Sequence, residues 1–248
     1  MKTSQFAPEA AEAFRKFVLQ PDFPCLGAKA AFNSDSQTIR VFEELGSAES
    51  TAELAAALHD FTRLVGRDSV EPNGGATPHS GGSTESRPTD YSTFIAIFES
   101  PRETTEIEFE HLIWKQLRLL HARDTRGEWA ANVASDPADP HFSFSFGGQA
   151  LYVIGMHAHS SRTARRFPWP AMIFNPHEQF ERLRADGKWK HMQETIRERD
   201  RQLQGSINPM LSDFGEQSEA RQYSGRAVEA HWRAPFQAAT PGKCPFAH

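Results

Sequence analysis

The sequence has few of the features that assign a chain to a secreted or membrane-bound class. Its 248 residues include two cysteines, Cys25 and Cys244, so a disulfide framework is not expected. No apolar run approaches the roughly 20 residues that a membrane-spanning helix needs. The first residues, MKTSQFAPEAAEAF, lack the continuous apolar segment of a secretory signal. We therefore expect a cytoplasmic protein with no membrane partner.

Charge and nucleotide motifs are also sparse. The net charge is -5, which gives no global attraction to nucleic acid. No GxxxxGK[ST] segment is present, and no GxGxxG follows a strand, so neither signature of a nucleotide site is found. A GxSxG nucleophile elbow is absent too. An oxidoreductase with this sequence would take its electrons from an external donor, because no flavin or nicotinamide motif is visible.

Helical and strand periodicities alternate along the chain and predict one α+β domain over residues 1–248. Gly147 and Gly148 separate two strand-like runs and predict a β-hairpin. Its second strand is apolar on both faces, so we expect the hairpin at the centre of a mainly antiparallel or mixed sheet flanked by helices. The predicted helices are 7–19, 50–65, 105–120, 177–186 and 188–203, and the predicted strands are 37–45, 91–100, 142–146, 149–156 and 170–176.

Local signals mark the ends of these elements. Ser50 with Glu53, and Thr105 with Glu108, have the spacing of a capping box. Residues 21–32, PDFPCLGAKAAF, contain two prolines and a glycine and predict a loop. Residues 67–90 are rich in Gly, Ser, Pro and Thr and predict a flexible insertion, and residues 237–248 predict a mobile tail.

The segment GMHAHSSRTARRF, residues 155–167, follows a strand that we expect to be buried. His157 and His159 are two residues apart, so on an extended chain both rings point to the same side. Two imidazoles on one side could ligate a metal ion. The plainer interpretation is that one histidine caps the strand and the other faces water.

Three arginines follow these histidines within the same loop. Arg162, Arg165 and Arg166 lie beside Phe167 and Trp169. Guanidinium groups suit carboxylates and phosphates, although a solvated basic turn would have the same composition. Histidine, arginine and aromatic residues together are what haem needs, since iron takes a histidine and the propionates take arginine.

Other candidate residues lie in separate segments. His177 begins a predicted helix, where it could be a second iron ligand, a hydrogen-bond donor in a distal pocket or a simple cap. Cys25 could be a nucleophile, a thiolate ligand or a packed core residue. Asn208 and Arg221 lie in polar, glycine-containing segments and are candidates for a substrate pocket.

Several stretches together resemble the YqcI/YcgG family. They are FPCLGAKAA, FEHLIWKQLRLLH, HFSFSFGGQALYVIGMH, SSRTARRFPWPAMIFNPHEQFERLR, RDRQLQGSINPML and SEARQYSGR. The similarity runs from about residue 21 to 236, and its most specific block is 141–184. One departure is that Ala234 stands where many relatives have a cysteine, so a role that needs that thiol does not carry over.

The resemblance implies a haem b enzyme that uses dioxygen to oxidise a nitrogen of an amine or guanidine. By position, His157 would be the proximal ligand, and Arg162, Arg165 and Arg166 would bind propionates or a substrate carboxylate. Glu110 or Glu219 could anchor the substrate cation, and the sequence does not choose between them.

Two alternative functions remain open at this point. The first is a non-haem metalloenzyme in which His157, His159 and a third residue such as His177 hold iron or zinc. The second is a haem-binding sensor or carrier without turnover. A homodimer is compatible with all three functions.

Overall fold

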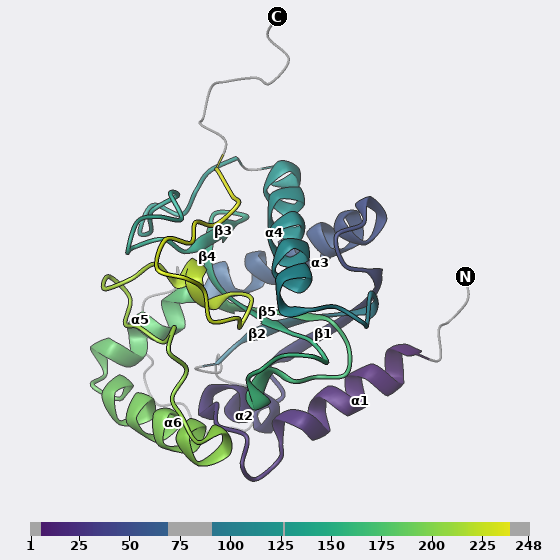
Figure 1. Cartoon of the computed structure of the whole chain (residues 1–248). Helices are drawn as coiled ribbons and strands as arrows, with labels where there is room; N and C mark the ends of the chain where they lie inside the picture. The colour runs from purple at the N-terminus through teal and green to yellow at the C-terminus, as the bar shows by residue number, and fades with distance from the viewer. Residues whose placement is uncertain (1–5, 69–90, 126, 239–248) are drawn as a thin grey trace, which may run out of the picture.

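The predicted strands all form, and they pair into one mixed sheet, as predicted for an α+β fold (Figure 1). The computed structural model describes residues 6–68, 91–125 and 127–238. The strand order is β1-β2-β5-β4-β3, with β1 parallel to β2 and the other pairs antiparallel. The strands are β1 Gln37–Glu44, β2 Thr93–Ser100, β3 Phe144–Phe146, β4 Gln149–Met156 and β5 Ala171–Pro176.

Helices cover both faces of the sheet. In Figure 1 α3 and α4 lie above it, whereas α1 and α2 lie below it and α6 lies at the lower left. The helices are α1 Phe6–Val18, α2 Leu26–Asn33, α3 Ala48–Asp68, α4 Glu106–Arg123, α5 His177–Ala185 and α6 Trp189–Gln204, and the short 3-10 turns are η1 Thr163–Arg165 and η2 Glu219–Gln222.

Alternation along β2 divides the apolar core into two clusters. Phe94 and Phe98 face the cluster that α3 and α4 complete, and Ile95 and Ile97 face the cluster that α1 completes. This division follows from strand geometry, since successive side chains point to opposite faces. The second cluster is the one beside the candidate site.

The hairpin lies at an edge of the sheet, not at its centre. β3 is a three-residue edge strand, and β5 occupies the middle position. β4 pairs with β3 on one side and β5 on the other, and its side chains pack into both core clusters, so both of its faces are apolar. An apolar strand therefore indicated burial correctly but did not specify the order of the strands.

Two local predictions are wrong. Residues 26–33 form α2, which begins after the second proline with Cys25 as its N-cap, so neither proline interrupts the helix. α3 begins at Ala48, and the hydroxyl of Ser47 accepts a hydrogen bond from the backbone of Ser50 at 3.1 Å. Ser50 is therefore already inside the helix. The other predicted capping box, Thr105 with Glu108, is present.

Gly155 on β4 allows the C-terminal segment to pack directly on the sheet. Its N–H donates to the carbonyl of Tyr223 at 2.6 Å. A Cβ at this position would lie 2.9 Å from that oxygen and 2.9 Å from Phe109, closer than packed atoms allow. This contact holds η2 beside β4 and so fixes the residues that line the candidate site.

Parts of the chain lie outside the described residues. These include residues 69–90 of the predicted insertion and residues 239–248 of the predicted tail. Among the helices that the structure describes, none has the length and apolar character needed to cross a bilayer.

Candidate functional site

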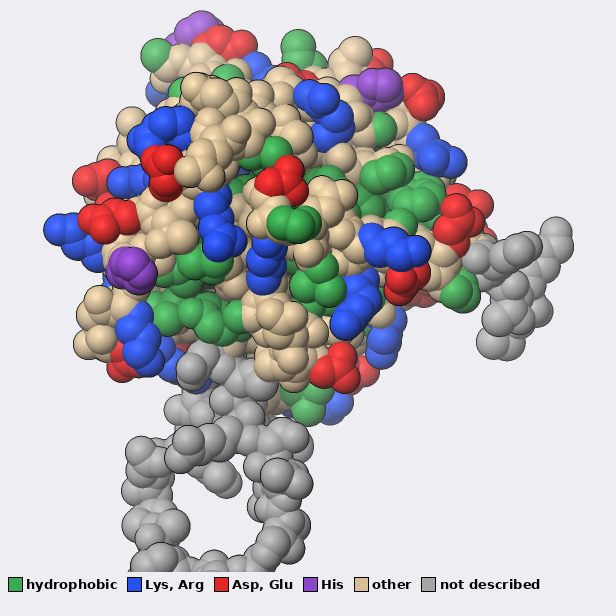
Figure 2. All heavy atoms as spheres, turned by 90° about the horizontal axis from the view of Figure 1, so that it is seen from below, with side chains coloured by type: hydrophobic (Ala, Val, Ile, Leu, Met, Phe, Trp, Pro, Cys, Tyr) green, Lys and Arg blue, Asp and Glu red, His purple; other side chains and the backbone are tan. Residues whose placement is uncertain are grey.

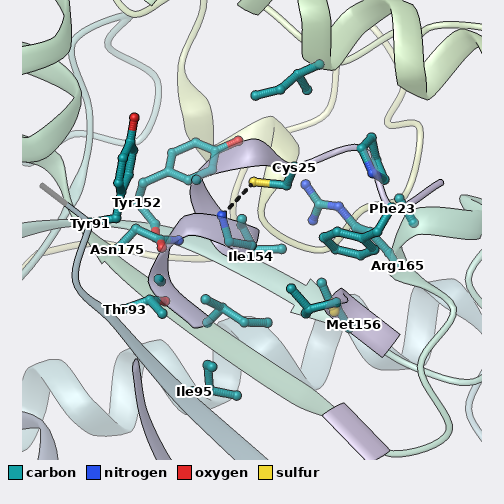
Figure 3. Close-up of a pocket in the computed structure, with 18 of the residues that line it drawn as sticks. Phe23, Cys25, Tyr91, Thr93, Ile95, Tyr152, Ile154, Met156, Arg165 and Asn175 are labelled. Atoms are coloured by element: carbon teal, nitrogen blue, oxygen red, sulfur yellow. Dashed lines mark hydrogen bonds between the residues drawn. The ribbon is translucent and has the colours of Figure 1, made fainter. Parts of the chain in front are cut away.

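A largely apolar cavity of about 260 Å³ lies between the sheet and the helices α1, α2, α5 and α6. We call it the thiol cavity, because Cys25 is part of its wall (Figure 3). Alternate residues of three neighbouring strands form its floor, since side chains two apart on a strand share a face. These floor residues are Thr93 and Ile95 on β2, Ile173 and Asn175 on β5, and Tyr152 and Ile154 on β4.

The thiol of Cys25 lies at the N-terminus of α2. Its Sγ accepts a hydrogen bond from the N–H of Ala28 at 3.4 Å, drawn as a dashed line in Figure 3. Burial raises the pKa of this thiol, while the N–H groups of Ala28 and Gly27 and the charge of Arg165 lower it. The same groups would stabilise a thiolate once a metal ion replaced the proton.

Arg165 extends from η1 into the thiol cavity on the side of Cys25 (Figure 3). Its Nη1 donates to the carbonyl of Tyr223 at 3.2 Å and to that of Gly155 at 3.4 Å. Burial lowers the pKa of Arg165, and Tyr152 and Asp200 oppose that shift. Among the described residues the guanidinium has no carboxylate in an ion pair, so it can accept an anionic ligand group.

Basic side chains also occur on the outside of this helical layer. Figure 2 views the molecule from below Figure 1, the side on which α1 and α2 lie. Lysine and arginine side chains cross the middle of that face, and hydrophobic patches lie on either side of them. Acidic side chains lie among them, so this face carries charges of both signs.

A second cavity of about 100 Å³ adjoins the first. We call it the acid cavity, because the buried side chain of Glu219 is in its wall. Three aromatic rings belong to the wall of both cavities, and Phe214 adds a fourth ring to the acid cavity. The shared rings are those of Tyr152, Phe180 and Trp189.

Glu219 and His177 face each other in the acid cavity. Glu219 is 5% exposed and accepts a hydrogen bond from the hydroxyl of Tyr223 at 2.7 Å. His177 is 3% exposed, and its Nε2 lies 4.0 Å from Oε2 of Glu219, too far for a hydrogen bond. Its Nδ1 has no hydrogen-bond partner among the described residues.

Burial sets the protonation of this pair. It raises the pKa of Glu219 to about 8, although the hydroxyls of Ser143 and Tyr223 and the charge of Arg184 act against it. Burial, and after it the charge of Arg184, lowers the pKa of His177 to about 4. Near pH 7 the acid is therefore protonated and the imidazole is neutral. The predicted position of His177 at a helix start is confirmed.

His157 lies away from both cavities. Its side chain is 1% exposed, and its ring stacks on Phe109 with centroids 4.2 Å apart. Nδ1 lies 3.4 Å from the hydroxyl of Thr104. Burial lowers the pKa of His157 to about 4. In this structure the predicted proximal ligand is a packed core side chain that lines neither cavity.

His159 and Phe167 also have partners within the fold. His159 lies at the surface, with Nε2 2.7 Å from a carboxylate oxygen of Glu103. Phe167 is buried against α1, with its ring centroid 5.0 Å from that of Phe14. Neither side chain lines one of the two cavities. The roles of these residues in ligating a metal and contacting haem stay predictions.

The three predicted arginines separate into different environments. Arg162 reaches the wall of the thiol cavity, but its Nη2 pairs with Asp200 at 2.5 Å. Arg166 turns away and donates from Nε to the carbonyl of Ser160 at 2.9 Å. Arg165 is therefore the arginine that remains available to a ligand in the cavity.

The predicted substrate residues are likewise dispersed. Asn208 lines the thiol cavity, and its backbone N–H donates to Asp200 at 3.0 Å. Arg221 lines a separate surface hollow and donates to the carbonyl of Glu229 at 2.9 Å. Glu110 is buried in a cluster with Arg226 and lines neither cavity.

The histidine-rich metal site is not assembled by this fold. No group of three or more histidine, cysteine, aspartate or glutamate side chains that could hold a metal ion occurs within the described parts of the chain. The sequence indicated Cys25 but left its role open, and it gave no signal for Tyr152 as a cavity residue. Recognition of the helix that follows Cys25 would have indicated that this thiol lies at a helix N-terminus.

The fold and the cavities define an α+β protein with adjoining ligand-sized cavities on one side of its sheet. The model of the YqcI/YcgG family matches residues 14–237, so the chain belongs to this family, as predicted. It is 28% identical over 211 residues to a Bacillus subtilis (strain 168) protein described as uncharacterized protein YqcI, covering 81% of this chain and 74% of that protein. No solved structure matches the chain.

Proposed function

We propose that this chain is a haem-dependent oxygenase that oxidises a nitrogen of an amine or guanidine with dioxygen and an external electron donor. The observation that carries the proposal is that one largely apolar cavity holds a thiol at a helix N-terminus and a guanidinium that forms no ion pair with a carboxylate of the described residues. The resemblance described above supplies the reaction class.

The donor set of the thiol cavity fits haem b. Iron accepts a cysteine thiolate as an axial ligand, and propionates pair with arginine. Cys25 would hold the iron and Arg165 a propionate, while apolar side chains such as Ile95 and Ile154 would contact the porphyrin. The ligand assignment therefore moves from His157 to Cys25, because Cys25 faces the cavity and His157 does not.

When bound, the haem would supply the redox chemistry with dioxygen that oxidation of a nitrogen requires. The chain's own residues would bind the haem and the substrate and orient them. The N–H of Ala28 would keep the thiolate in place, and the floor of the cavity would exclude water from the reacting side. The reduced thiol that this role needs is consistent with a cytoplasmic enzyme.

A haem-binding sensor or carrier is the second candidate, since the same cavity would hold haem without turnover. A non-haem metalloenzyme has less support, because His157, His159 and His177 are not grouped within the described residues. The two candidates with haem differ in one measurable outcome, the appearance of an oxidised product.

The test combines haem titration with a product assay. Wild-type protein should bind one haem per chain with a sharp Soret band, and Arg165→Gln should bind it roughly 10-fold more weakly. Arg166→Gln is the matched control, because Arg166 leaves the same turn but donates to a carbonyl outside the cavity. With reductant and air, an arginine- or lysine-like amine should gain oxygen at nitrogen. Absence of haem uptake by the wild type would overturn the proposal, and haem without product would favour the sensor or carrier.

A further inference from the structure

We infer that the acid cavity is a binding site for the protonated end of a small organic cation, an ammonium or guanidinium group, with Glu219 as its counter-ion. This inference deepens the proposed function by locating a cationic end of the substrate other than the nitrogen that is oxidised, but the binding it describes does not depend on haem. Four features of the described residues carry it: a buried carboxyl group, an adjacent imidazole, a set of aromatic rings and sufficient volume.

The first feature is a buried carboxyl group that forms no ion pair with a lysine or arginine of the described residues. Oε1 of Glu219 accepts a hydrogen bond from Tyr223, the hydroxyl of Ser143 also acts on the carboxyl group, and the neutral ring of His177 lies opposite it. A buried carboxylate is normally paired with a cation, because isolated buried charge is costly. Arg184, the nearest arginine in the wall, is ion-paired with Glu181 instead. The cavity therefore offers an anionic position that no side chain of the described chain fills.

The second feature is the adjacent imidazole. Oε2 of Glu219 and Nε2 of His177 are 4.0 Å apart, so they do not bond to each other. One ligand nitrogen in front of both atoms could donate a hydrogen to each if His177 carries its proton on Nδ1. His177 is almost completely buried and lines the cavity, with Nδ1 3.7 Å from Oε1 of Glu181 on its own helix and Nε2 toward Glu219.

The third feature is the aromatic wall. Tyr152, Phe180, Trp189 and Phe214 line this small cavity together. Aromatic faces attract cations and are the usual lining of sites for ammonium groups. The wall already binds one guanidinium, because Arg184 lies 4.9 Å from the ring centroid of Trp189 and 6.0 Å from that of Phe214. These rings are therefore suited to a planar cation.

The fourth feature is size and connection. A volume of about 100 Å³ exceeds the roughly 10 to 15 Å³ that one water needs, so a guanidinium or ammonium group fits. The shared residues Tyr152, Phe180 and Trp189 join this space to the thiol cavity. A molecule held by its cationic end at Glu219 would extend toward Cys25 and Arg165.

Binding a cation at pH 7 should release a proton. The protonated carboxyl group loses its proton to the buffer, and the ligand's positive charge replaces it, so charge is conserved. The groups around this carboxyl group are His177 and Arg184 on α5, Tyr152 on β4, Ser143 before β3 and Tyr223 after η2, and Asp213 is also in the cavity wall. Affinity should rise with pH up to about pH 8, where Glu219 ionises, and then level off.

Isothermal titration of the full chain with butylguanidine tests the inference, with butylurea as the neutral ligand of the same shape. We expect butylguanidine to bind at least 10-fold more tightly than butylurea at pH 8.5, and Glu219→Gln to abolish that preference. Titration at pH 7 in two buffers of different ionisation enthalpy should show close to one proton released by the wild type and none by E219Q. Glu178→Gln, on the outer side of α5 and paired with Arg182, is the matched control and should bind as the wild type does.

Equal affinity for the two ligands, or unchanged binding and proton release in E219Q, would overturn the inference. If E219Q does not fold, the comparison of the two ligands in the wild type from pH 6 to pH 9 still decides it. Titrations with and without haem separate the two proposals. Glu219-dependent binding without haem uptake would refute the oxygenase alone, and haem uptake without a preference for the cation would refute this site alone.

Discussion

Glu110 and Glu219 are two buried carboxyl groups with opposite surroundings. Glu110 is 4% exposed and accepts hydrogen bonds from Arg226 at 3.0 and 3.2 Å and from the indole of Trp232 at 2.9 Å. Glu219 is buried to a similar extent, but it accepts a hydrogen bond from the hydroxyl of Tyr223 and faces the neutral imidazole of His177. The fold supplies a cation for the first and leaves the second for a ligand. Burial alone therefore does not identify a functional acid, whereas its partners do.

The largest effect should come from removing the cation beside Glu110. Arg226→Met leaves a charged, buried carboxylate without its partner, and we expect it to lower the free energy of unfolding by about 3 to 5 kcal/mol. Arg184→Met is the comparison, because its ion pair with Glu181 is partly exposed and should contribute less than about 1 kcal/mol. Urea unfolding of both variants measures the difference, and equal losses would remove the distinction between the two sites.

Glu219→Gln should change how stability depends on pH. The folded pKa of about 8 lies above the usual 4.5, so the stabilisation from Glu219 is complete below pH 4.5 and is lost as the pH rises through 8. At about 1.4 kcal/mol per pKa unit, the loss is on the order of 5 kcal/mol at most. The variant should gain stability relative to the wild type from pH 5 to pH 9 in urea titrations. Parallel pH curves for the two proteins would contradict a neutral, unpaired Glu219.

The histidines should destabilise the protein in acid. The pKa values of His157 and His177 lie near 4, below the usual 6.5, so their contribution is complete above pH 6.5 and is lost as the pH falls toward 4. Each histidine should lower the free energy of unfolding by about 3 kcal/mol as the pH falls from 6.5 to 4. His157→Phe keeps a ring against Phe109 and should lose less stability between pH 7 and pH 4.5 than the wild type does. His191→Gln, at an exposed position on α6, is the control, and its stability should depend on pH as that of the wild type does. If the stability of H157F also followed the wild-type dependence on pH, His157 would be in contact with water.

A smaller effect should follow from two glycines with positive φ. Gly225, at φ +87°, lies against Arg165, and a Cβ there would be 2.7 Å from Cδ of that side chain. Gly205, at φ +79°, has no heavy atom within 4 Å of such a Cβ among the described residues. Gly205→Ala should lower the free energy of unfolding by about 1 kcal/mol, from backbone strain alone. Gly225→Ala should lower it by about 1 kcal/mol more and should also weaken haem binding, because Arg165 shifts. Equal costs would show that Arg165 is not held against this glycine.

The polar loop after β4 also contains side chains that are paired within the fold and one in the cavity wall that forms no ion pair with a carboxylate of the described residues. In the loop, Arg162 pairs with Asp200, Arg166 donates to the carbonyl of Ser160, and His159 pairs with Glu103. Arg162 and Arg165 both reach the cavity wall, but of the two only Arg162 forms an ion pair with a carboxylate of the described residues. A cluster of histidines and arginines after a buried strand therefore need not be a site, since carboxylates and carbonyls elsewhere in the fold can satisfy its members.

Periodicity predicted the strands and most helices well, because each depends on residues that are close in the sequence. α2 was missed because it has eight residues, few large apolar side chains and a proline directly before its N-cap. The order of the strands was not predictable from the hairpin, because strands distant in sequence decide it.

The candidate site was predictable only in part. Arg165 and Asn208 were identified from the sequence, and both line the thiol cavity. The choice between Glu110 and Glu219 was not accessible, because the partners of Glu110 lie 116 and 122 residues away in the chain. Whether a buried polar group is satisfied is a property of the tertiary fold, and this property is what distinguishes the two acids.

The most direct test of the account is the absorption spectrum of the haem-loaded, reduced, carbon monoxide-treated protein beside two variants. The account predicts that the wild type and His157→Phe share a Soret band at the long wavelength typical of thiolate ligation, and that Cys25→Ser loses it. A wild-type band typical of imidazole ligation that disappears in H157F and persists in C25S would contradict it.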